Sequence, residues 1–361
     1  NIVAPLRRWA KEAGDRIWLA ERPAPERDWT RVTYAEGEDI VARIASALAR
    51  RGMDQASPLM ILSGNSLEHA FMMFGAMWAG APVAPVSRAY SLMSSDYEKL
   101  LYVFDLIRPQ MIFVQDGRMF EKALNRLDLN GVEIVYVQNK PEIARPGATV
   151  TSYAELVAEP RSGKAEDAYR ALGKDTVAKY LFTSGSTGMP KGVINTHGMM
   201  AFNSVMAQRL IETWETDEPS VALSFLPWNH TFGGNSVMNG VMSRGGTLYI
   251  DDGSPQPGLF DRTIRNLKEI APTAYSTVPV AFTWLTEALE KDAALAKNFF
   301  SRLRSLAYGG AALSQDIYDR IQAVAVRTTG ERIIFTTGYG ATETAPTIMS
   351  VHWATERMGL L

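Results

Sequence analysis

Cysteine is absent from the 361 residues of this chain. That absence excludes disulfide bonds, thiolate metal sites and thiol nucleophiles. It also agrees with a cytoplasmic location, which we expect. Histidine is scarce as well, and its positions do not show the paired spacing of zinc ligands: His69, His197, His230 and His352. We therefore do not expect a zinc site.

The chain also lacks an excess of charge and a long apolar run. It has 37 basic and 39 acidic residues, for a net charge of -2, so composition gives no reason to expect a nucleic-acid partner. Residues 70–86 form an uncharged apolar stretch, but Gly80, Pro82 and Pro85 interrupt it. A helix followed by a strand explains this stretch better than a membrane span of about 20 apolar residues, so we expect no span.

Segments of helical and strand-like periodicity alternate along the chain, which predicts an α/β fold with mainly parallel sheets. The predicted strands are residues 59–62, 82–86, 111–114, 133–137, 180–183, 221–225, 247–250, 306–308 and 333–335. The predicted helices are residues 33–52, 66–78, 96–107, 121–127, 199–214, 260–270, 280–289 and 314–325. A polar stretch at about 139–175, rich in proline and charge, is interpreted as a connector with one or two short helices. We therefore expect two α/β portions of one domain, residues 1–175 and 176–361.

Residues 183–192, with the sequence TSGSTGMPKG, form a glycine-rich loop that follows an apolar strand. Glycines let main-chain N–H groups approach an anion, hydroxyl groups can donate hydrogen bonds to it, and a lysine adds a compact positive charge. The residues concerned are Thr183, Ser184, Gly185, Ser186, Thr187, Gly188 and Lys191. The common nucleoside-triphosphatase loop needs Gly-Lys followed by Ser or Thr, which is not the order here. A Ser/Gly-rich surface turn is the alternative for a loop of this composition alone.

The loop resembles the phosphate-binding segment of the acyl-adenylate-forming superfamily, which includes acyl-CoA synthetases, aryl-CoA ligases and the adenylation domains of peptide synthetases. Three more segments match that superfamily in the expected order. LPWNHTFGG at 226–234 is similar to its aromatic-histidine segment, YGGAALS at 308–314 to its adenine-side loop, and TGYGATET at 337–344 to its adenine and magnesium segment. The resemblance implies the large N-terminal domain of these enzymes, built from two stacked α/β subdomains.

The resemblance also implies a reaction in two halves. A carboxylate attacks the α-phosphate of ATP to give an acyl-adenylate and pyrophosphate, and the thiol of CoA then displaces AMP. The catalytic residues implied are Lys191, His230, Thr342 and Glu343, with Glu343 as the Mg²⁺ ligand. The ATP-binding residues implied are the loop residues above together with Gly310, Ala311, Ala312, Thr337, Gly338, Tyr339, Gly340, Ala341 and Thr342. ATP, Mg²⁺ and CoA are therefore the expected cofactors and co-substrates.

The acyl pocket implied by the resemblance contains His230, Phe232, Gly233, Gly234, Ser236, Val278, Thr337 and Tyr339. Relatives that activate amino acids carry an aspartate just after the aromatic-histidine segment, whereas Gly233, Gly234 and Asn235 follow Phe232 here. Amino-acid activation is therefore disfavoured. The wider segments look most like bacterial feruloyl-CoA synthases, which activate hydroxycinnamates such as ferulate. One departure is Gly338-Tyr339-Gly340-Ala341, where those relatives tend to have Gly-Leu-Gly-Met.

The superfamily has further sequence after the position that aligns with residue 361, including a ribose-binding aspartate, a hinge and a small C-terminal domain. On this resemblance we expect that the 361 residues alone do not complete both half-reactions, and a homodimer is one arrangement left open. Two other functions stay open at this point. A medium- or long-chain fatty acyl-CoA synthetase would use the same chemistry, and a non-catalytic nucleotide-binding module would keep the fold without it. A serine hydrolase is disfavoured because the sequence contains no G-x-S-x-G segment.

Overall fold

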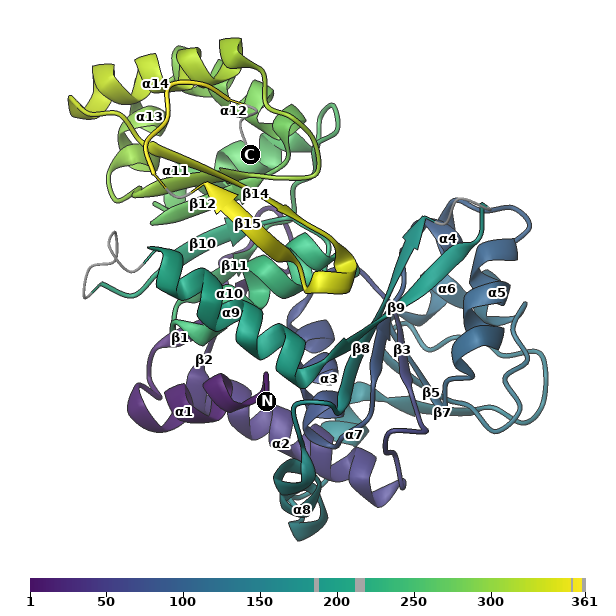
Figure 1. Ribbon diagram of the computed structural model, residues 1–361. Coiled ribbons are helices and arrows are strands. Elements are labelled where there is room, and N and C mark those ends of the chain that lie inside the picture. The colour runs from purple at the N-terminus through teal and green to yellow at the C-terminus, as the bar shows by residue number, and fades with distance from the viewer. Residues whose placement is uncertain (185–187, 212–217, 352, 359–361) are drawn as a thin grey trace. The chain divides into compact units, whose positions relative to one another are not determined.

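The structure is a computed structural model that describes residues 1–184, 188–211, 218–351 and 353–358 (Figure 1). The chain divides into two units, each of which is built from segments that are distant in sequence. Unit 1 consists of Asn1–Gly14, Tyr34–Phe202 and Pro227–Thr231, and unit 2 consists of Asp15–Thr33, Asn203–Leu226 and Phe232–Leu361. Residue 175, the sequence-based limit between two portions, lies inside unit 1.

Unit 1 contains a seven-stranded sheet in the order β7-β6-β5-β3-β4-β8-β9. All neighbouring strands are parallel except β8 and β9, which are antiparallel. The strands are β3 (Leu59–Leu62), β4 (Val83–Pro85), β5 (Met111–Asp116), β6 (Glu133–Gln138), β7 (Thr149–Ser152), β8 (Val177–Ser184) and β9 (Pro190–Thr196). The helices are α1 (Ala4–Glu12), α2 (Tyr34–Arg50), α3 (Leu67–Trp78), α4 (Ala89–Leu92), α5 (Glu98–Ile107), α6 (Gly117–Leu124), α7 (Tyr153–Ala158) and α8 (Gly163–Ala171).

The two faces of this sheet are both apolar and both covered, as expected for parallel strands. On one face Met60, Ile112 and Val114 form a buried cluster with residues of α5 and α6, and Figure 1 shows these two helices on the same side of the sheet. On the other face Phe113 contacts Tyr153 of α7, with ring centroids 6.4 Å apart. Successive side chains of β5 therefore serve opposite layers, which fixes the register of the strand.

Unit 2 contains two four-stranded sheets, in the orders β10-β11-β1-β2 and β12-β13-β14-β15. Each has one antiparallel edge strand, β2 in the first and β15 in the second. The strands are β1 (Ile17–Glu21), β2 (Thr30–Thr33), β10 (Val221–Ser224), β11 (Thr247–Ile250), β12 (Ala274–Thr277), β13 (Ser305–Tyr308), β14 (Ile334–Gly340) and β15 (Thr347–Val351). The helices are α10 (Asn239–Ser243), α11 (Phe260–Glu269), α12 (Pro279–Lys291), α13 (Ala293–Phe300) and α14 (Gln315–Thr329); α9 (His197–Ile211) begins in unit 1 and enters unit 2 at Asn203.

An aromatic core joins α11 to α14 with the β12–β15 sheet. Tyr275 of β12 contacts Phe282 and Phe299 edge-on, at 6.2 and 5.6 Å between ring centroids. Phe335 of β14 lies 5.4 Å from both Phe282 and Tyr318. Edge-to-face pairs of this kind add to the free energy gained by burying the rings, so they hold β14 firmly in place.

The structure confirms the α/β class and most of the expected elements, with some differences in their limits. The helix expected at 121–127 begins earlier, at Gly117, because the Asp116 carboxylate accepts the N–H of Met119 at 3.0 Å and caps it. The polar stretch 139–175 contains β7 as well as two helices. Five further strands were not expected: β1, β2, β9, β12 and β15. The parallel partner of β1 is β11, which lies far along the chain, whereas β9 and β15 each pair with the strand just before them.

Helix α3 is buried along its whole length, so residues 70–86 form a core helix and a strand, as predicted. Within the described residues no helix is long and apolar enough to cross a membrane. Gly75 lets α3 approach α2 closely, since a Cβ at this position would lie 2.4 Å from Cγ2 of Ile44. Any larger residue at 75 must push the two helices apart.

We expect Gly75→Ala to lower the free energy of unfolding by about 1–2 kcal/mol, because the added methyl overpacks the interface by more than the gain in helix propensity. Urea denaturation measures this change. Gly163→Ala is the matched control, since Gly163 begins α8 and nothing lies within 4 Å of its Cβ position. An unchanged midpoint for Gly75→Ala would show that α2 shifts without cost.

His69 of α3 is a buried histidine whose Nε2 has no hydrogen-bond partner among the described residues. Its Nδ1 lies 2.8 Å from the Gly64 carbonyl, which can only accept, so Nδ1 donates. Burial lowers the pKa of His69 from 6.5 to about 4, and the charge of Lys179 acts in the same direction. The unfolded chain therefore takes up this proton near pH 6.5, before the folded chain does, and stability falls as the pH drops from 6.5 toward 4.

The wild type loses unfolding free energy when the pH falls from 7 to 4.5, and His69 accounts for part of that loss. We expect the loss in His69→Asn to be smaller by about 2 kcal/mol. Other acid-sensitive groups contribute equally to both proteins, so the difference isolates His69. Denaturant unfolding at the two pH values gives the numbers. Equal losses for wild type and His69→Asn would mean that His69 is not neutral in the fold.

Candidate functional site

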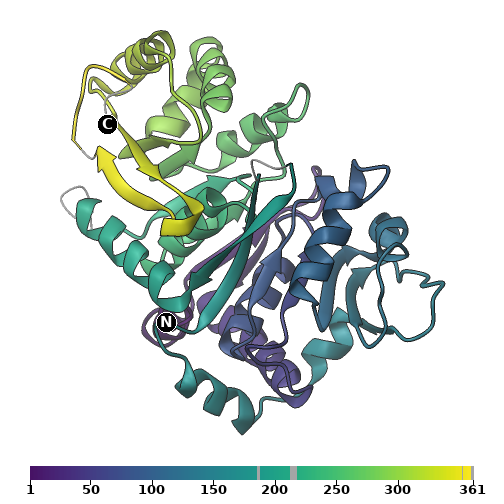
Figure 2. The ribbon, with the colours of Figure 1, turned by 45° about the vertical axis from the view of Figure 1, so that its right-hand side comes forward.

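The described parts of the glycine-rich segment lie at the end of β8 and the beginning of β9 in unit 1, and Figure 2 shows these two strands in teal. Antiparallel pairing places Thr183 opposite Lys191 and Ser184 opposite Pro190. Gly185, Ser186 and Thr187 lie outside the described residues. Lys191 is exposed, and among the residues that the structure describes it forms no ion pair. Its charge is therefore available for an anion at this turn.

The residues around Pro190 explain why β9 begins there. Pro190 lacks an N–H, and it stands as the first residue of β9 at the edge of the sheet, where proline is tolerated. Gly188 has φ of 85°, a left-handed conformation that glycine adopts without strain. These two residues set the end of the loop and direct the chain into β9 with Lys191 next in line.

The aromatic-histidine segment of unit 1 is held by residues that the sequence did not single out. The main-chain N–H of Trp228 donates to Oδ1 of Asn65 at 3.1 Å. The ring of His69 lies edge-on to Trp228 with centroids 5.0 Å apart. Two positions after Trp228, His230 is exposed, and desolvation by its neighbours lowers its pKa, so it is neutral at pH 7. A neutral imidazole can accept as well as donate a hydrogen bond.

The segment that follows is a π-helix in unit 2, Phe232–Met238, and it continues into α10. It contains Phe232, Gly233, Gly234 and Ser236, all of which were predicted for the acyl pocket. Gly233 and Gly234 are buried, whereas Phe232 and Ser236 are partly exposed. π-Helices are rare and are found mainly at functional sites. No pattern in the sequence indicated this geometry.

Unit 2 brings residues predicted for the acyl pocket next to residues 309–312, the segment predicted as the adenine-side loop. The Phe232 ring lies 3.3 Å from the position that a Cβ on Gly309 would occupy, and Cγ1 of Val278 lies 4.0 Å from the equivalent position on Gly310. Gly310, Ala311 and Ala312 are exposed at the end of β13. The two segments therefore meet at one end of the parallel strands, where α/β sheets bind ligands.

The adenine and magnesium segment lies on β14 and the turn to β15, which Figure 1 shows as the yellow pair of strands. The hydroxyl of Thr337 donates to the carbonyl of Tyr308 at 3.2 Å, which ties β14 to β13. Tyr339 is 58% exposed and pairs across the ladder with Met349. Position 340 requires glycine because the main chain of Pro346 lies close to it. A Cβ at this position would lie 2.0 Å from the Pro346 carbonyl oxygen.

The turn itself carries Thr342 and Glu343 on a short 3-10 helix, Thr342–Thr344. The main-chain N–H of Ala341 donates to the carbonyl of Pro346 at 3.1 Å and to the hydroxyl of Thr344 at 3.0 Å, which closes the turn. Glu343 is exposed at its tip. The side chain of Asn203, from α9, donates to the carbonyls of Thr344 and Thr347 at 3.1 and 2.8 Å. Asn203 was not among the predicted site residues.

The donor set at this turn suits magnesium bound together with a nucleotide. Among the described residues, no group of three or more His, Asp or Glu side chains could hold a metal ion. Mg²⁺ usually keeps several waters and takes one or two carboxylates plus substrate phosphates, rather than a cage of protein ligands. A single exposed carboxylate such as Glu343 fits that pattern. A resident zinc or calcium ion would need more ligands than this turn supplies.

Lys191 and His230 belong to unit 1, whereas Thr342, Glu343 and Tyr339 belong to unit 2. Within unit 2 the structure brings the π-helix next to the adenine-side loop, and it joins that loop to β14 through Tyr308 and Thr337. The convergence of Lys191 with Glu343 stays a prediction.

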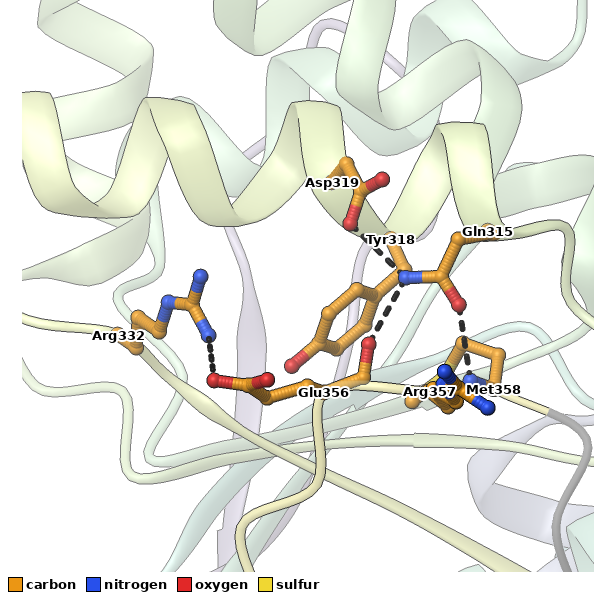
Figure 3. Close-up of a pocket in the computed structure, with 7 residues that line it drawn as sticks. All are labelled: Gln315, Tyr318, Asp319, Arg332, Glu356, Arg357 and Met358. Atoms are coloured by element: carbon orange, nitrogen blue, oxygen red, sulfur yellow. Dashed lines mark hydrogen bonds and ion pairs between the residues drawn. The ribbon is translucent and has the colours of Figure 1, made fainter.

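A separate hollow of about 500 Å³ lies in unit 2 beside α14, and Figure 3 shows its lining. It contains none of the predicted site residues; its lining is Gln315, Tyr318, Asp319, Arg332, Glu356, Arg357 and Met358. Gln315 accepts the N–H of Met358 and donates to the carbonyl of Glu356, at 3.1 and 3.0 Å. These bonds attach the segment after β15 to α14. The amide of Gln315 in the lining therefore binds the main chain of that segment.

Known proteins give independent information on this arrangement. The profile of the family described as AMP-binding enzyme matches residues 6–359. The chain is 27% identical over 338 residues to 4-coumarate–CoA ligase 3 of Arabidopsis thaliana, covering 90% of this chain and 53% of that protein. It is 25% identical over 320 residues to luciferin 4-monooxygenase of Photinus pyralis, covering 88% and 54%. The chain thus spans about half the length of these curated relatives.

Solved structures share the fold. One is the anthranilate CoA ligase AuaEII in complex with anthranoyl-AMP, with a TM-score of 0.74 and 16% identity over 97% of this chain and 61% of that one. Another is a benzoate CoA ligase from Burkholderia xenovorans LB400, with a TM-score of 0.72 and 18% identity over 98% and 63%. The family profile covers nearly the whole sequence, and the parallel sheets with their hairpins agree with it, so this chain belongs to the AMP-binding enzyme family of the acyl-adenylate-forming superfamily.

Proposed function

We propose that this chain carries the ATP- and acid-binding part of an acid–thiol ligase that activates an aromatic carboxylic acid, such as a hydroxycinnamate, as its acyl-adenylate and then transfers the acyl group to CoA. The observation that carries the proposal is the turn at the end of β14, with Thr342 partly buried and Glu343 exposed, in a chain of the AMP-binding enzyme family. Because no covalent enzyme nucleophile is needed, positioning and charge stabilisation dominate this chemistry.

In the first half-reaction, a carboxylate oxygen of the acid attacks the α-phosphorus of ATP, and the bond to the β-phosphate oxygen breaks. Lys191 and the hydroxyls of Thr183 and Ser184 are proposed to hold the departing pyrophosphate. Exposed Lys191 suits this role, because its charge is not already neutralised by a carboxylate among the described residues. A lysine acts there as a point charge with three donors.

Thr342 is proposed to donate a hydrogen bond to the α-phosphate, and Glu343 to ligate Mg²⁺ delivered with ATP. When bound, the metal neutralises charge that accumulates on the phosphate oxygens. Tyr339 offers an exposed ring on which adenine can stack, and Gly310 to Ala312 offer an open wall without large side chains. In the second half-reaction the CoA thiolate attacks the acyl carbon and AMP leaves.

The choice of an aromatic acid rests on the pocket. Gly233 and Gly234 on the π-helix have no side chains, and the partly exposed ring of Phe232 stands beside Gly309, which suits a flat ring. A 4-coumarate–CoA ligase is among the relatives, and a benzoate CoA ligase shares the fold. Ferulate is the hydroxycinnamate we propose as the substrate. His230 is proposed to contact the carboxylate of the acid.

A fatty acyl-CoA synthetase is the second candidate, because long-chain-fatty-acid–CoA ligases of Xenopus laevis and Drosophila melanogaster match at 23% and 27% identity. Both candidates use the same ATP site and differ only in the acyl pocket. Titration with non-hydrolysable feruloyl- and octanoyl-adenylate mimics separates them by calorimetry. We expect tighter binding of the feruloyl mimic. Preference for the octanoyl mimic would move the substrate class to fatty acids, and binding of neither by a folded chain would contradict the proposal.

Glu343→Gln tests the metal role. We expect it to lower acid-dependent ATP–pyrophosphate exchange by the intact enzyme by on the order of 100-fold, because the amide is a poor ligand for a hard cation. Glu331→Gln is the control, since Glu331 is also an exposed carboxylate of unit 2 but lies outside the four segments. Exchange that survives Glu343→Gln at the wild-type rate would show that Glu343 is not the metal ligand.

A further inference from the structure

The Glu343 carboxylate reaches into solvent, so its position depends on the main chain that bears it. Glu343 is exposed, and the structure gives its side chain no hydrogen bond or ion pair among the described residues. The place of the carboxylate is then set by the turn between β14 and β15. Whatever holds this turn also sets where a metal ion would be bound.

The turn is closed internally but is strained. The Thr344 hydroxyl accepts the N–H of Ala341, and it also donates to the carbonyl of Pro346. Ala345 has φ of 59°, a left-handed conformation that a residue with a Cβ rarely adopts, and its side chain is buried. Such a conformation persists only where the surroundings over-determine it, and it is concentrated at functional sites.

Asn203, which lies outside the turn, holds Ala345 in this conformation through hydrogen bonds to the main chain on both sides of it. Its Nδ2 donates to the carbonyls of Thr344 and Thr347, which stand on either side of Ala345 and Pro346. The two bonds, at 3.1 and 2.8 Å, use both N–H groups of one amide. Asn203 lies on α9, and it belongs to unit 2 together with the turn. One side chain of α9 thus bonds to the main chain on both sides of Ala345.

We propose that Asn203 is a positioning residue for Thr342 and Glu343, through which it sets the affinity of the site for Mg²⁺ and the rate of adenylation. This proposal rests on the proposed function for the metal role of Glu343. Asn203 does not touch the reacting atoms. Groups that orient metal ligands change metal affinity by about 10- to 100-fold when they are removed.

The test compares Asn203→Asp with Gln208→Glu in the intact enzyme. Asn203→Asp keeps the size of the side chain, removes both donors and turns a carboxylate oxygen toward two carbonyl oxygens. Gln208→Glu makes the same amide-to-acid change on the same helix. Gln208 is partly buried in unit 2, and among the described residues it makes no contact with the turn. A loss of helix stability or an added negative charge would affect both variants alike.

The first readout is hydrogen exchange of the main-chain amides of residues 341–347, which does not depend on activity. We expect exchange in Asn203→Asp to be about ten-fold faster than in the wild type, since an anchored turn loses two hydrogen bonds. Gln208→Glu should exchange like the wild type. Unchanged exchange in Asn203→Asp would overturn the proposal, whatever its activity.

The second readout is the Mg²⁺ concentration that gives half-maximal ATP–pyrophosphate exchange. We expect it to rise about ten-fold or more in Asn203→Asp and to stay unchanged in Gln208→Glu, with the KM for the acid little altered. A faster-exchanging turn with an unchanged Mg²⁺ requirement would overturn the positioning role and leave the proposed function standing. A wild type inactive with every acid would overturn the proposed function and the metal role, whereas the hydrogen-exchange result would still decide whether Asn203 anchors the turn.

Discussion

The constraint on which the rest depends is the main-chain pairing of an antiparallel edge strand with the last parallel strand of a sheet. It occurs in unit 1 between β8 and β9, and in unit 2 between β14 and β15. A hairpin turn must lie at the carboxyl end of the parallel strand from which it starts. In α/β sheets this is the end at which ligands bind. The Thr342–Glu343 turn is such a turn, and Ser184 and Pro190, at the described ends of the glycine-rich segment, face each other at the carboxyl end of β8.

The chemistry proposed for the two hairpins depends on two charged side chains that are exposed, Lys191 and Glu343. Lys191 is an exposed residue of β9 that pairs with Thr183, and Glu343 is an exposed residue of the turn that joins β14 to β15. A charge held on a rigid base needs little reorganisation when a ligand of opposite charge arrives, which is the condition for electrostatic stabilisation of a reacting phosphate. Side chains that would neutralise these charges within the protein would work against that role.

Two residues with no proposed catalytic role hold the main chain around the candidate site. Asn65 holds Trp228 next to the exposed His230, and Asn203 holds the turn under Glu343. Both are side-chain amides that bind main-chain atoms; Asn65 lies between β3 and α3, and Asn203 lies on α9. The π-helix at 232–238 does the same for the acyl pocket, since it sets where Phe232 meets Gly309. Rigid elements behind a reacting group keep it within the narrow range that catalysis requires.

The sequence by itself determined the strands and helices that depend on residues next to one another in the chain. The apolar runs at 59–62 and 247–250 are β3 and β11, the Ser66 cap begins α3, and the order of four segments indicated the family. Tertiary structure alone decided the parallel pairing of β1 with β11, the π-helix, and the contacts of Asn65 and Asn203. The reason is separation along the chain: Asn203 bonds residues 141 and 144 positions away, and Asn65 one 163 positions away. Periodicity reports the neighbours within a turn or a strand, whereas such partners are chosen only when the sheets and helices have packed.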